Sequence, residues 1–215
     1  MNDPIYFRQL EIGPMANFVY LVGDPETKVC AVIDPAWDAE VIADTAEADG
    51  YRIERILITH GHHDHINAIE TLLARVDARV HVHAQDAFAI PSIGDALQTV
   101  EGGQRLELGK LSIRCLHTPG HTEGSQCFRF EGNLMTGDTL FIRSCGRVDF
   151  ENSDPEKMWA SLKSLAALEN ELIVMPGHNY SSEKSVALGV EKQQNRYLRT
   201  VVNWGPEKFR ELVGL

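Results

Sequence analysis

The sequence predicts an α/β domain over residues 1–215, in which helices cover both outer faces of packed β-sheets. Three observations support this prediction. Short β-rich runs outnumber the stretches with a helical period, these runs form two halves that are each flanked by helices, and no linker, low-complexity tract or strict repeat divides the chain. A single α/β domain is the simplest arrangement that buries all of these apolar faces.

The first third of the chain reads as strands, then a helix, then a strand. "NFVYLVGD" and "KVCAVIDP" are short β-rich runs separated by a turn at Gly23-Asp24-Pro25. Asp38 then caps a helix that ends at Gly50. The strand "RIERILITH" leads directly into a run of histidines, after which "HINAIETLLARV" has apolar residues at a helical period.

The pattern repeats loosely in the rest of the chain. "ARVHVHA" is predicted to be a strand, and "QRLELGKLSIRCLHTPG" a hairpin that turns at Gly109-Lys110. Further strands are "SQCFRF", "NLMTGD" and "ELIVMPG". Asp154-Pro155 starts a helix, because a capping residue stands before a proline in the first turn, and "SSEKSVALGVEKQQNRYLR" is predicted to be a helix with a polar face.

The composition excludes several classes of partner. A net charge of −11 argues against nucleic acid and anionic membrane surfaces, since both attract clustered Lys and Arg. No apolar stretch approaches the ~18 residues of a membrane span, and the N-terminus lacks the basic and apolar segments of a secretory signal. The four cysteines are scattered and form no CxxC pair. Together these features predict a cytoplasmic protein.

Four histidines and one aspartate occupy the six positions from His60 to His65. In an extended segment, His60 and His62 point the same way, whereas His63 points away and is expected to be exposed. Asp64 and His65 fall in the turn into the helix and can aim at a neighbouring point. The spacing therefore offers two adjacent metal sites with imidazole and carboxylate ligands, which suit zinc, iron or manganese.

These four residues do not complete two metal sites. Three later polar residues each follow an apolar strand beside a glycine: His121 in "TPGHT", Asp138 in "MTGDT" and His178 in "MPGHNY". Because sites in α/β proteins gather where strands end and loops begin, these three residues are candidates for the missing ligands.

"THGHHDH", "TPGHT", "GDTLF" and "PGHNY", in this order, resemble the motif set of the metallo-β-lactamase superfamily over essentially the whole chain. The resemblance implies a four-layer αβ/βα sandwich with a metal centre at one edge. It implies that His60, His62 and His121 hold a first metal. It further implies that Asp64, His65 and His178 hold a second metal, and that Asp138 bridges the two.

The complete ligand set is similar to that of glyoxalase II, or hydroxyacylglutathione hydrolase. This resemblance implies two divalent metal ions, zinc in the first place and iron or manganese as alternatives, and hydrolysis of a thioester by a metal-bound hydroxide that Asp64 orients or deprotonates. Tyr180 matches a substrate contact of that family, and Arg147 stands where the family has a lysine. Both residues are therefore predicted to bind a glutathione-derived substrate, although Asp149 replaces a family tyrosine. The sequence leaves a homodimer open.

Two alternatives remain. "YFRQL" and "LFIRSCGRVDF" resemble segments of the persulfide dioxygenases, a branch that implies a single iron held by His60, His121 and Asp138 and the oxidation of glutathione persulfide. A metal-binding module without catalytic activity is the other alternative, but no ligand of the set is lost. A true β-lactamase is not expected, because that branch has a cysteine at the position of Asp138. The thioester hydrolase is the interpretation that we adopt.

Overall fold

The computed structural model describes residues 5–215, so the predicted domain begins with four residues outside the described range. Its strands are β1 (Tyr6–Ile12), β2 (Asn17–Asp24), β3 (Val29–Ile33), β4 (Arg52–Leu57), β5 (Arg79–His83), β6 (Leu97–Val100), β7 (Arg105–Leu108), β8 (Leu111–His117), β9 (Gln126–Phe130), β10 (Asn133–Gly137), β11 (Leu140–Phe141), β12 (Ser144–Cys145), β13 (Ile173–Pro176) and β14 (Val186–Ala187). Its helices are α1 (Ala39–Ala48), α2 (His63–Ile66), α3 (Ile69–Leu73), the short 3₁₀ helices η1 (Ala84–Ala89) and η2 (Gly94–Ala96), α4 (Pro155–Ala166), α5 (Leu188–Gln194), α6 (Arg196–Asn203) and α7 (Pro206–Val213).

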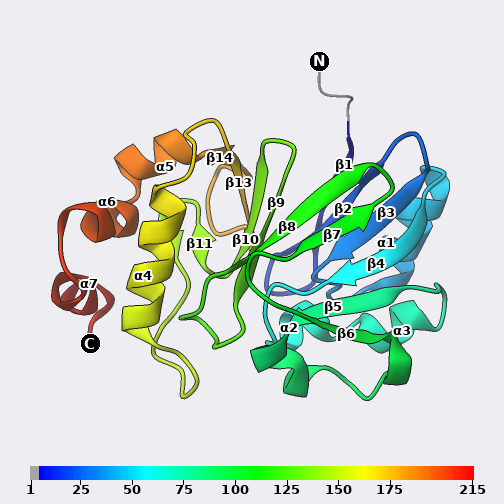
Figure 1. The fold of residues 1–215 in the computed structure, drawn as a ribbon, viewed down its shortest axis with the longest axis horizontal. Coiled ribbons are helices and arrows are strands. Elements are labelled where there is room, and N and C mark those ends of the chain that lie inside the picture. Colours follow the sequence, from blue (N-terminus) through cyan, green and yellow to red (C-terminus); the bar gives the residue numbers. More distant parts are fainter. Residues whose placement is uncertain (1–4) are drawn as a thin grey trace.

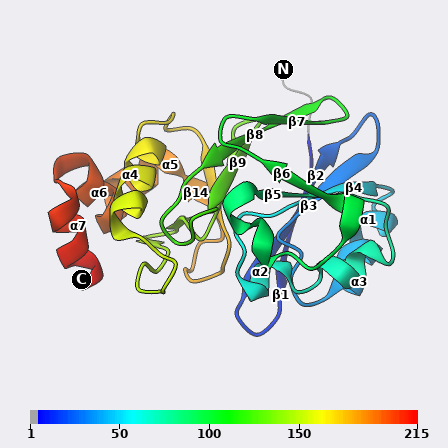
Figure 2. The ribbon, with the colours of Figure 1, turned by 60° about the horizontal axis from the view of Figure 1, so that its bottom comes forward.

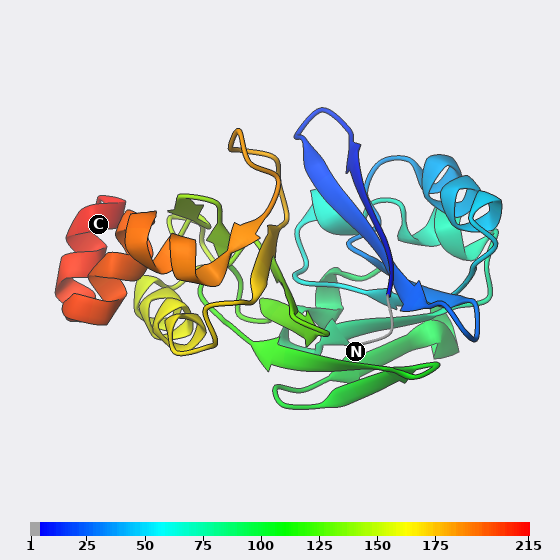
Figure 3. The ribbon, with the colours of Figure 1, turned by 90° about the horizontal axis from the view of Figure 1, so that it is seen from above.

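Two six-stranded sheets form the middle of the molecule. The first sheet has the order β1-β2-β3-β4-β5-β6, and the second has the order β14-β13-β10-β9-β8-β7. Helices α1 and α3 lie beyond the first sheet, and α4 to α7 lie beyond the second (Figures 1 and 3). The layers are therefore helices, sheet, sheet and helices, which confirms the four-layer sandwich.

Three apolar clusters hold these layers together. Strand β2 shows how, because all eight of its residues are buried. Phe18 and Tyr20 pack between the two sheets, whereas Val19 and Leu21 pack with the helices of the first half. A strand that is covered on both faces has a continuous apolar sequence, as "NFVYLV" does. The third cluster lies under α4 to α7 and includes Phe209.

The strand directions bring several loops to one edge of the sandwich. Strands β3 and β4 run parallel in the first sheet, and β10 and β13 run parallel in the second. The carboxyl ends of parallel neighbours lie at the same edge of a sheet. The residues that follow these four strands include Asp34, His60, Asp138 and His178.

Most predicted elements are present, but two predicted helices are interrupted. The helix expected after the histidine run divides into α2 and α3, because the backbone N–H of Ala68 donates to the carbonyl of Pro35 (3.2 Å). The helix expected over residues 181–199 divides into β14, α5 and α6. Asn195 causes the second break, since its side chain caps α6 by accepting from the Tyr197 N–H (2.9 Å) and donates to the carbonyl of Ser144 (2.9 Å).

Some elements of the fold were not predicted from the sequence, and others were. Strands β1 and β6 and helix α7 were not predicted, whereas Asp38 and Asp154 cap α1 and α4 as expected. No helix within residues 5–215 is both long enough and apolar enough to cross a membrane. The four cysteines are buried free thiols.

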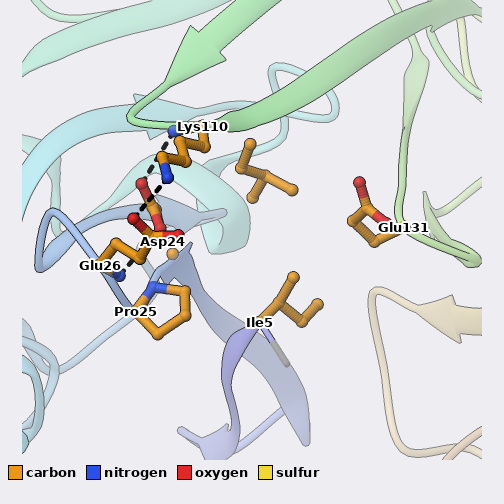
Figure 4. A pocket seen from close by; sticks show the side chains of 8 residues that line it. Ile5, Asp24, Pro25, Glu26, Lys110 and Glu131 are labelled. Atoms are coloured by element: carbon orange, nitrogen blue, oxygen red, sulfur yellow. Dashed lines mark hydrogen bonds and ion pairs between the residues drawn. The ribbon is translucent and has the colours of Figure 1, made fainter. Parts of the chain in front are cut away.

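A cavity of about 180 Å³ lies at the other end of β2 and β3, where Asp24 pairs with Val29. Figure 4 shows Asp24 and Glu26 directly beside Lys110 at one side of this cavity. The Asp24 carboxylate accepts hydrogen bonds from the backbone N–H groups of Lys110 (2.8 Å) and Glu26 (3.0 Å) and from the Thr27 hydroxyl (2.9 Å). It therefore ties the β2–β3 turn to the β7–β8 turn.

Asp24 makes stability depend on pH. Hydrogen bonds from the backbone of Lys110 and Glu26 hold the pKa of the Asp24 carboxyl below its usual value. A lowered folded-state pKa contributes stability above the unfolded value of about 3.9, and this contribution is lost as the pH falls through the folded value. We therefore expect Asp24→Asn to melt at a lower temperature than the wild type at pH 7, with the difference shrinking below about pH 4. A pH-independent difference in thermal melts would contradict this assignment.

Candidate metal centre

The histidine run lies at the carboxyl end of β4 and continues into α2. His60 is buried two residues beyond Ile58, whose backbone N–H donates to the carbonyl of His81 in the neighbouring strand. His62 keeps an extended backbone and precedes α2, which carries Asp64 and His65. Figure 2 turns α2 toward the reader. The change from strand to helix therefore occurs within the run, as its spacing predicted.

Two groups of three side chains converge at this edge. In the first group, His60 Nε2 lies 3.1 Å from His62 Nδ1, and His121 joins them from the loop after β8. Within each group the candidate ligand atoms all lie within 4.8 Å of one another. Imidazole nitrogens gathered at this separation can surround one metal ion.

The second group contains Asp64, His65 and His178. His65 Nε2 lies 3.1 Å from His178 Nε2, and Asp64 Oδ2 lies 3.4 Å from the same His178 atom. Both groups thus draw two residues from the histidine run and one residue from a loop of the second sheet.

Asp138 lies between the two groups, directly after β10. Its Oδ1 is 3.5 Å from His65 Nε2, and its Oδ2 is 3.5 Å from His121 Nε2 and 3.4 Å from His178 Nε2. All seven side chains that the sequence singled out as ligands are therefore brought together, and Asp138 reaches both groups.

The outer nitrogens of the imidazoles are held by neighbouring groups. His121 Nδ1 donates to the carbonyl of Arg147 (2.8 Å), and His178 Nδ1 donates to the carbonyl of Met15 (2.9 Å). Because a carbonyl can only accept, these contacts place the proton on Nδ1 and leave the Nε2 lone pair facing the centre. Such contacts orient metal-binding histidines in general.

The buried centre requires a positive charge. His121 Nε2 and Asp138 Oδ1 have no hydrogen-bond partner within the described residues, although both atoms are buried. Burial alone would lower the pKa of His65, but the carboxylates of Asp138 and Asp34 raise it to about 9. A divalent cation would satisfy the unpartnered atoms and supply this charge without a proton. The donor set of imidazoles and carboxylates therefore fits a metal pair.

Asp34 is a residue of the centre that the sequence analysis missed. Its Oδ1 accepts from the backbone N–H of Thr59 (2.7 Å), and its Oδ2 accepts from the Thr59 hydroxyl (2.6 Å) and lies 2.9 Å from His65 Nδ1. It lies close enough to His60 and His65 to form a third possible ligand group, but these contacts already occupy its oxygens. We therefore assign it to orienting His65. Its place after β3, parallel to β4, could have indicated it.

Asn17 fixes the position of Asp64. Its side-chain N–H₂ donates to Asp64 Oδ2 (2.9 Å) and to the Asp64 carbonyl (3.0 Å), and its Oδ1 accepts from the indole N–H of Trp37 (2.7 Å). No pattern in the sequence connects residues 17, 37 and 64. His63, by contrast, is exposed as expected, and its ring lies edge-on to Trp37.

Asp86 joins the two loops of the first group. It accepts hydrogen bonds from the backbone N–H groups of Gly61 (2.7 Å) and Gly124 (2.8 Å) and from the Thr122 hydroxyl (2.7 Å). Gly61 follows His60, and Thr122 follows His121. Asp86 was not predicted as a residue of the centre, because nothing near it in the chain indicates these partners.

The two predicted substrate residues lie beside different ligand groups, Tyr180 directly on a ring of the second group and Arg147 on a ring that contacts the first group. Tyr180 stacks on His178 with ring centroids 4.7 Å apart, and 58% of it is exposed. The Arg147 guanidinium pairs with Asp149 through two contacts of 2.9 and 2.8 Å and lies 4.4 Å from the centroid of the Phe150 ring. That ring contacts the imidazoles of both His62 and His121. Tyr180 and Arg147 thus border the centre.

Cys145 does not face the centre. It is buried in the apolar cluster under α4 to α7, and burial raises the pKa of its thiol to about 12. A protonated thiol within an apolar cluster is inert. Although Cys145 is only two residues from Arg147 in the sequence, its thiol is not a candidate for contact with the substrate.

Comparisons with known proteins found similar sequences and structures. The family model of the metallo-beta-lactamase superfamily matches residues 12–178. A hydroxyacylglutathione hydrolase of Fuscovulum blasticum is 40% identical over 166 residues, which cover 76% of this chain and 63% of that protein. The chain thus spans less than two thirds of the length of this relative.

Two solved structures cover more of both chains. ETHE1 from Myxococcus xanthus has a TM-score of 0.87 and 30% identity, and the match covers 97% of this chain and 89% of that one. TTHA1623, solved in a di-iron-bound form, has a TM-score of 0.77 and 32% identity, with 88% and 99% of the two chains covered.

The pair His65 and His63 allows a matched test of the second group. After loading with zinc, we expect about two ions per chain in the wild type and in His63→Ala, but about one in His65→Ala, because only His65 points into the centre. Elemental analysis of the purified proteins measures this number. Equal metal contents in His63→Ala and His65→Ala would remove His65 from the ligand set.

Asn17→Ala tests how Asp64 is held. The substitution removes both hydrogen bonds to Asp64 and leaves all seven candidate ligands in place. We expect the affinity for the more weakly bound ion to fall by about 10- to 100-fold, as is usual when a residue that orients a ligand is lost. Competition with a chromophoric chelator measures the affinity, and an unchanged value would show that Asp64 needs no support from Asn17.

Proposed function

Because the chain belongs to the metallo-β-lactamase superfamily and gathers seven histidine and aspartate side chains at one edge, we propose that it hydrolyses thioesters in the manner of hydroxyacylglutathione hydrolase. The proposed substrate is a thioester derived from glutathione. The observation that carries the proposal is the pair of three-residue groups joined by Asp138, since this arrangement offers a complete site for two ions. The named hydrolases at 40% identity support the choice of substrate.

The proposed ligands are those of the two groups. His60, His62 and His121 would hold one divalent ion, Asp64, His65 and His178 would hold the other, and Asp138 would contact both. When bound, such ions lower the pKa of a coordinated water to about 7 and polarise a substrate carbonyl. Zinc is the first expectation, with iron or manganese as alternatives, since the same ligands accept all three metals.

Asp64 is the proposed proton acceptor. Asn17 and the two histidines of the second group contact Oδ2 of the Asp64 carboxylate. We assign the other oxygen, Oδ1, to receive the proton of the attacking water. Removing that proton as the water attacks makes it a better nucleophile. The hydrogen bond from Asn17 also keeps the carboxylate from rotating away.

The leaving group needs little assistance from the protein. A thiolate whose parent thiol has a pKa near ~8.5 departs without a strong general acid. Tyr180 and Arg147, at the border of the centre, are proposed to contact the glutathione part. Arg147 would have to leave Asp149 or share its charge with the substrate. We extend the proposal to a cytoplasmic location, which suits four free thiols and a glutathione-derived substrate.

A second candidate is a persulfide dioxygenase with a single iron held by His60, His121 and Asp138. The fit to ETHE1 over 97% of this chain favours it, since the match to the hydrolase covers only 63% of that protein. The second group of ligands favours the hydrolase, because Asn17 and Asp34 hold Asp64 and His65 in place although a single iron would not use them.

Oxygen uptake by iron-loaded protein given glutathione persulfide separates the two candidates. We expect no uptake above the metal-free control, and hydrolysis of a hydroxyacylglutathione thioester by the zinc-loaded protein. His65→Ala should lower that hydrolysis by at least about 100-fold, since it removes a ligand of the second ion. Rapid oxygen uptake with release of sulfite, retained in His65→Ala, would assign the chain to the dioxygenases.

A further inference from the structure

A second cavity opens directly beside the metal centre. It has a volume of about 210 Å³ and lies between η1, the loop after β8 and the loop that precedes α4. His62 forms part of its wall, together with Asp86, Phe88, Ala89, Glu123 and Asn152. A molecule in this cavity would therefore touch the imidazole of a proposed metal ligand.

Phe88 gives this cavity an apolar wall that faces solvent. Its side chain is 80% exposed, the largest exposed fraction among the large apolar side chains of the described residues. Its ring therefore offers an apolar surface at the edge of a cavity that also contains His62, where the apolar part of a ligand can pack on it. Ala89, the next residue, adds a second apolar contact.

Hydrogen bonds tie the wall of the cavity to the metal centre. The three hydrogen bonds that Asp86 accepts from Gly61, Thr122 and Gly124 fix η1 against both loops of the first ligand group. Gly61 also packs closely on this wall, since a Cβ added there would lie 2.8 Å from the Cβ of Ala89. The cavity thus keeps a fixed distance from His62.

The charges of the wall select an uncharged ligand. The two ionisable carboxylates of the wall belong to Asp86, whose oxygens are occupied, and Glu123, which pairs with Lys157 (3.1 Å). No lysine or arginine is among the described residues that line the cavity. The carboxylates of glutathione would find no lysine or arginine among the described lining residues to pair with, whereas a neutral acyl group needs no such partner.

We propose that this cavity is an acyl pocket, which holds the uncharged chain on the carbonyl side of the thioester. The inference rests on the proposed thioester hydrolysis and adds a substrate class to it. A volume of about 210 Å³ is many times the ~10–15 Å³ that one water molecule needs, so the cavity has room for a chain of several carbon atoms. The preferred substrates are therefore medium-chain acyl thioesters, and Phe88 is a residue that determines this specificity.

The test compares acyl groups on one thiol. The zinc-loaded wild type is expected to hydrolyse hexanoyl-glutathione with a kcat/KM at least about tenfold above that for acetyl-glutathione. Phe88→Ala removes the apolar wall, and Asn152→Trp fills the cavity from an exposed position. Both substitutions should lower this ratio below about threefold. Trp204→Ala removes a similarly exposed aromatic side chain from the turn between α6 and α7, two helices of the layer beyond the second sheet (Figure 1), and should leave the ratio unchanged.

A binding measurement keeps the pocket testable without turnover. S-hexylglutathione and S-methylglutathione are thioethers that place an alkyl chain where the acyl group would lie. By titration calorimetry, the hexyl compound should bind at least about tenfold more tightly to the wild type, and Phe88→Ala should remove most of this preference. A hexyl preference that is absent, or is unchanged in both Phe88→Ala and Asn152→Trp, would overturn the acyl pocket.

The two proposals fail in different ways. If thioesters are hydrolysed without any chain-length preference, the hydrolase stands and the pocket is wrong. If no thioester is hydrolysed but the hexyl preference depends on Phe88, the pocket stands as a binding site for an uncharged chain and the hydrolase is wrong.

Discussion

The carboxylate of Asp34 is the interaction on which the shape of the histidine run depends. It is buried at the end of β3 and accepts from the backbone and hydroxyl of Thr59, at the start of the run, and it lies beside the ring of His65, near its end. An ionised carboxylate is costly to bury unless donors surround it, so Thr59 and His65 have to keep their donors directed at the Asp34 oxygens. The same contact sets the position of the strand end and the rotation of a ring in the following helix.

Asn17 and Asp86 extend this principle to the rest of the centre. Asn17 reaches across from β2 to hold Asp64, and Asp86 reaches from η1 to join the loops that carry His60 and His121. All three residues act by orienting other groups of the centre. They keep the imidazole and carboxylate groups of the centre from rotating and hold them aimed at common points. A cation bound at these points would offset the repulsion between the carboxylates.

Much of the fold and the convergence of the seven candidate ligands could be predicted because these signals are local. A helix cap such as Asp38 and an apolar strand are each predicted from a few neighbouring residues, and the spacing of the histidine run predicts which of its side chains point the same way. The interruption at Asn195 could not be predicted, since the backbone carbonyls to which its side chain donates lie about fifty residues away. Asn17 and Asp86 were missed for the same reason. The superfamily motifs identified the family, but the acyl pocket depends on η1, which no motif marks.

Each group of candidate ligands takes two residues from the first half of the chain and one from the second half. An ion held in either group would consequently cross-link the two sheets, much as a disulfide joins distant segments, and two ions would do so twice. Neither half alone carries all three residues of either group, so a fragment ending before β7 should gain less stability from the metal than the whole chain does. Folding of the two halves and metal binding would then be coupled, and loss of metal in a cell would expose the protein to proteolysis by loosening the contact between its sheets.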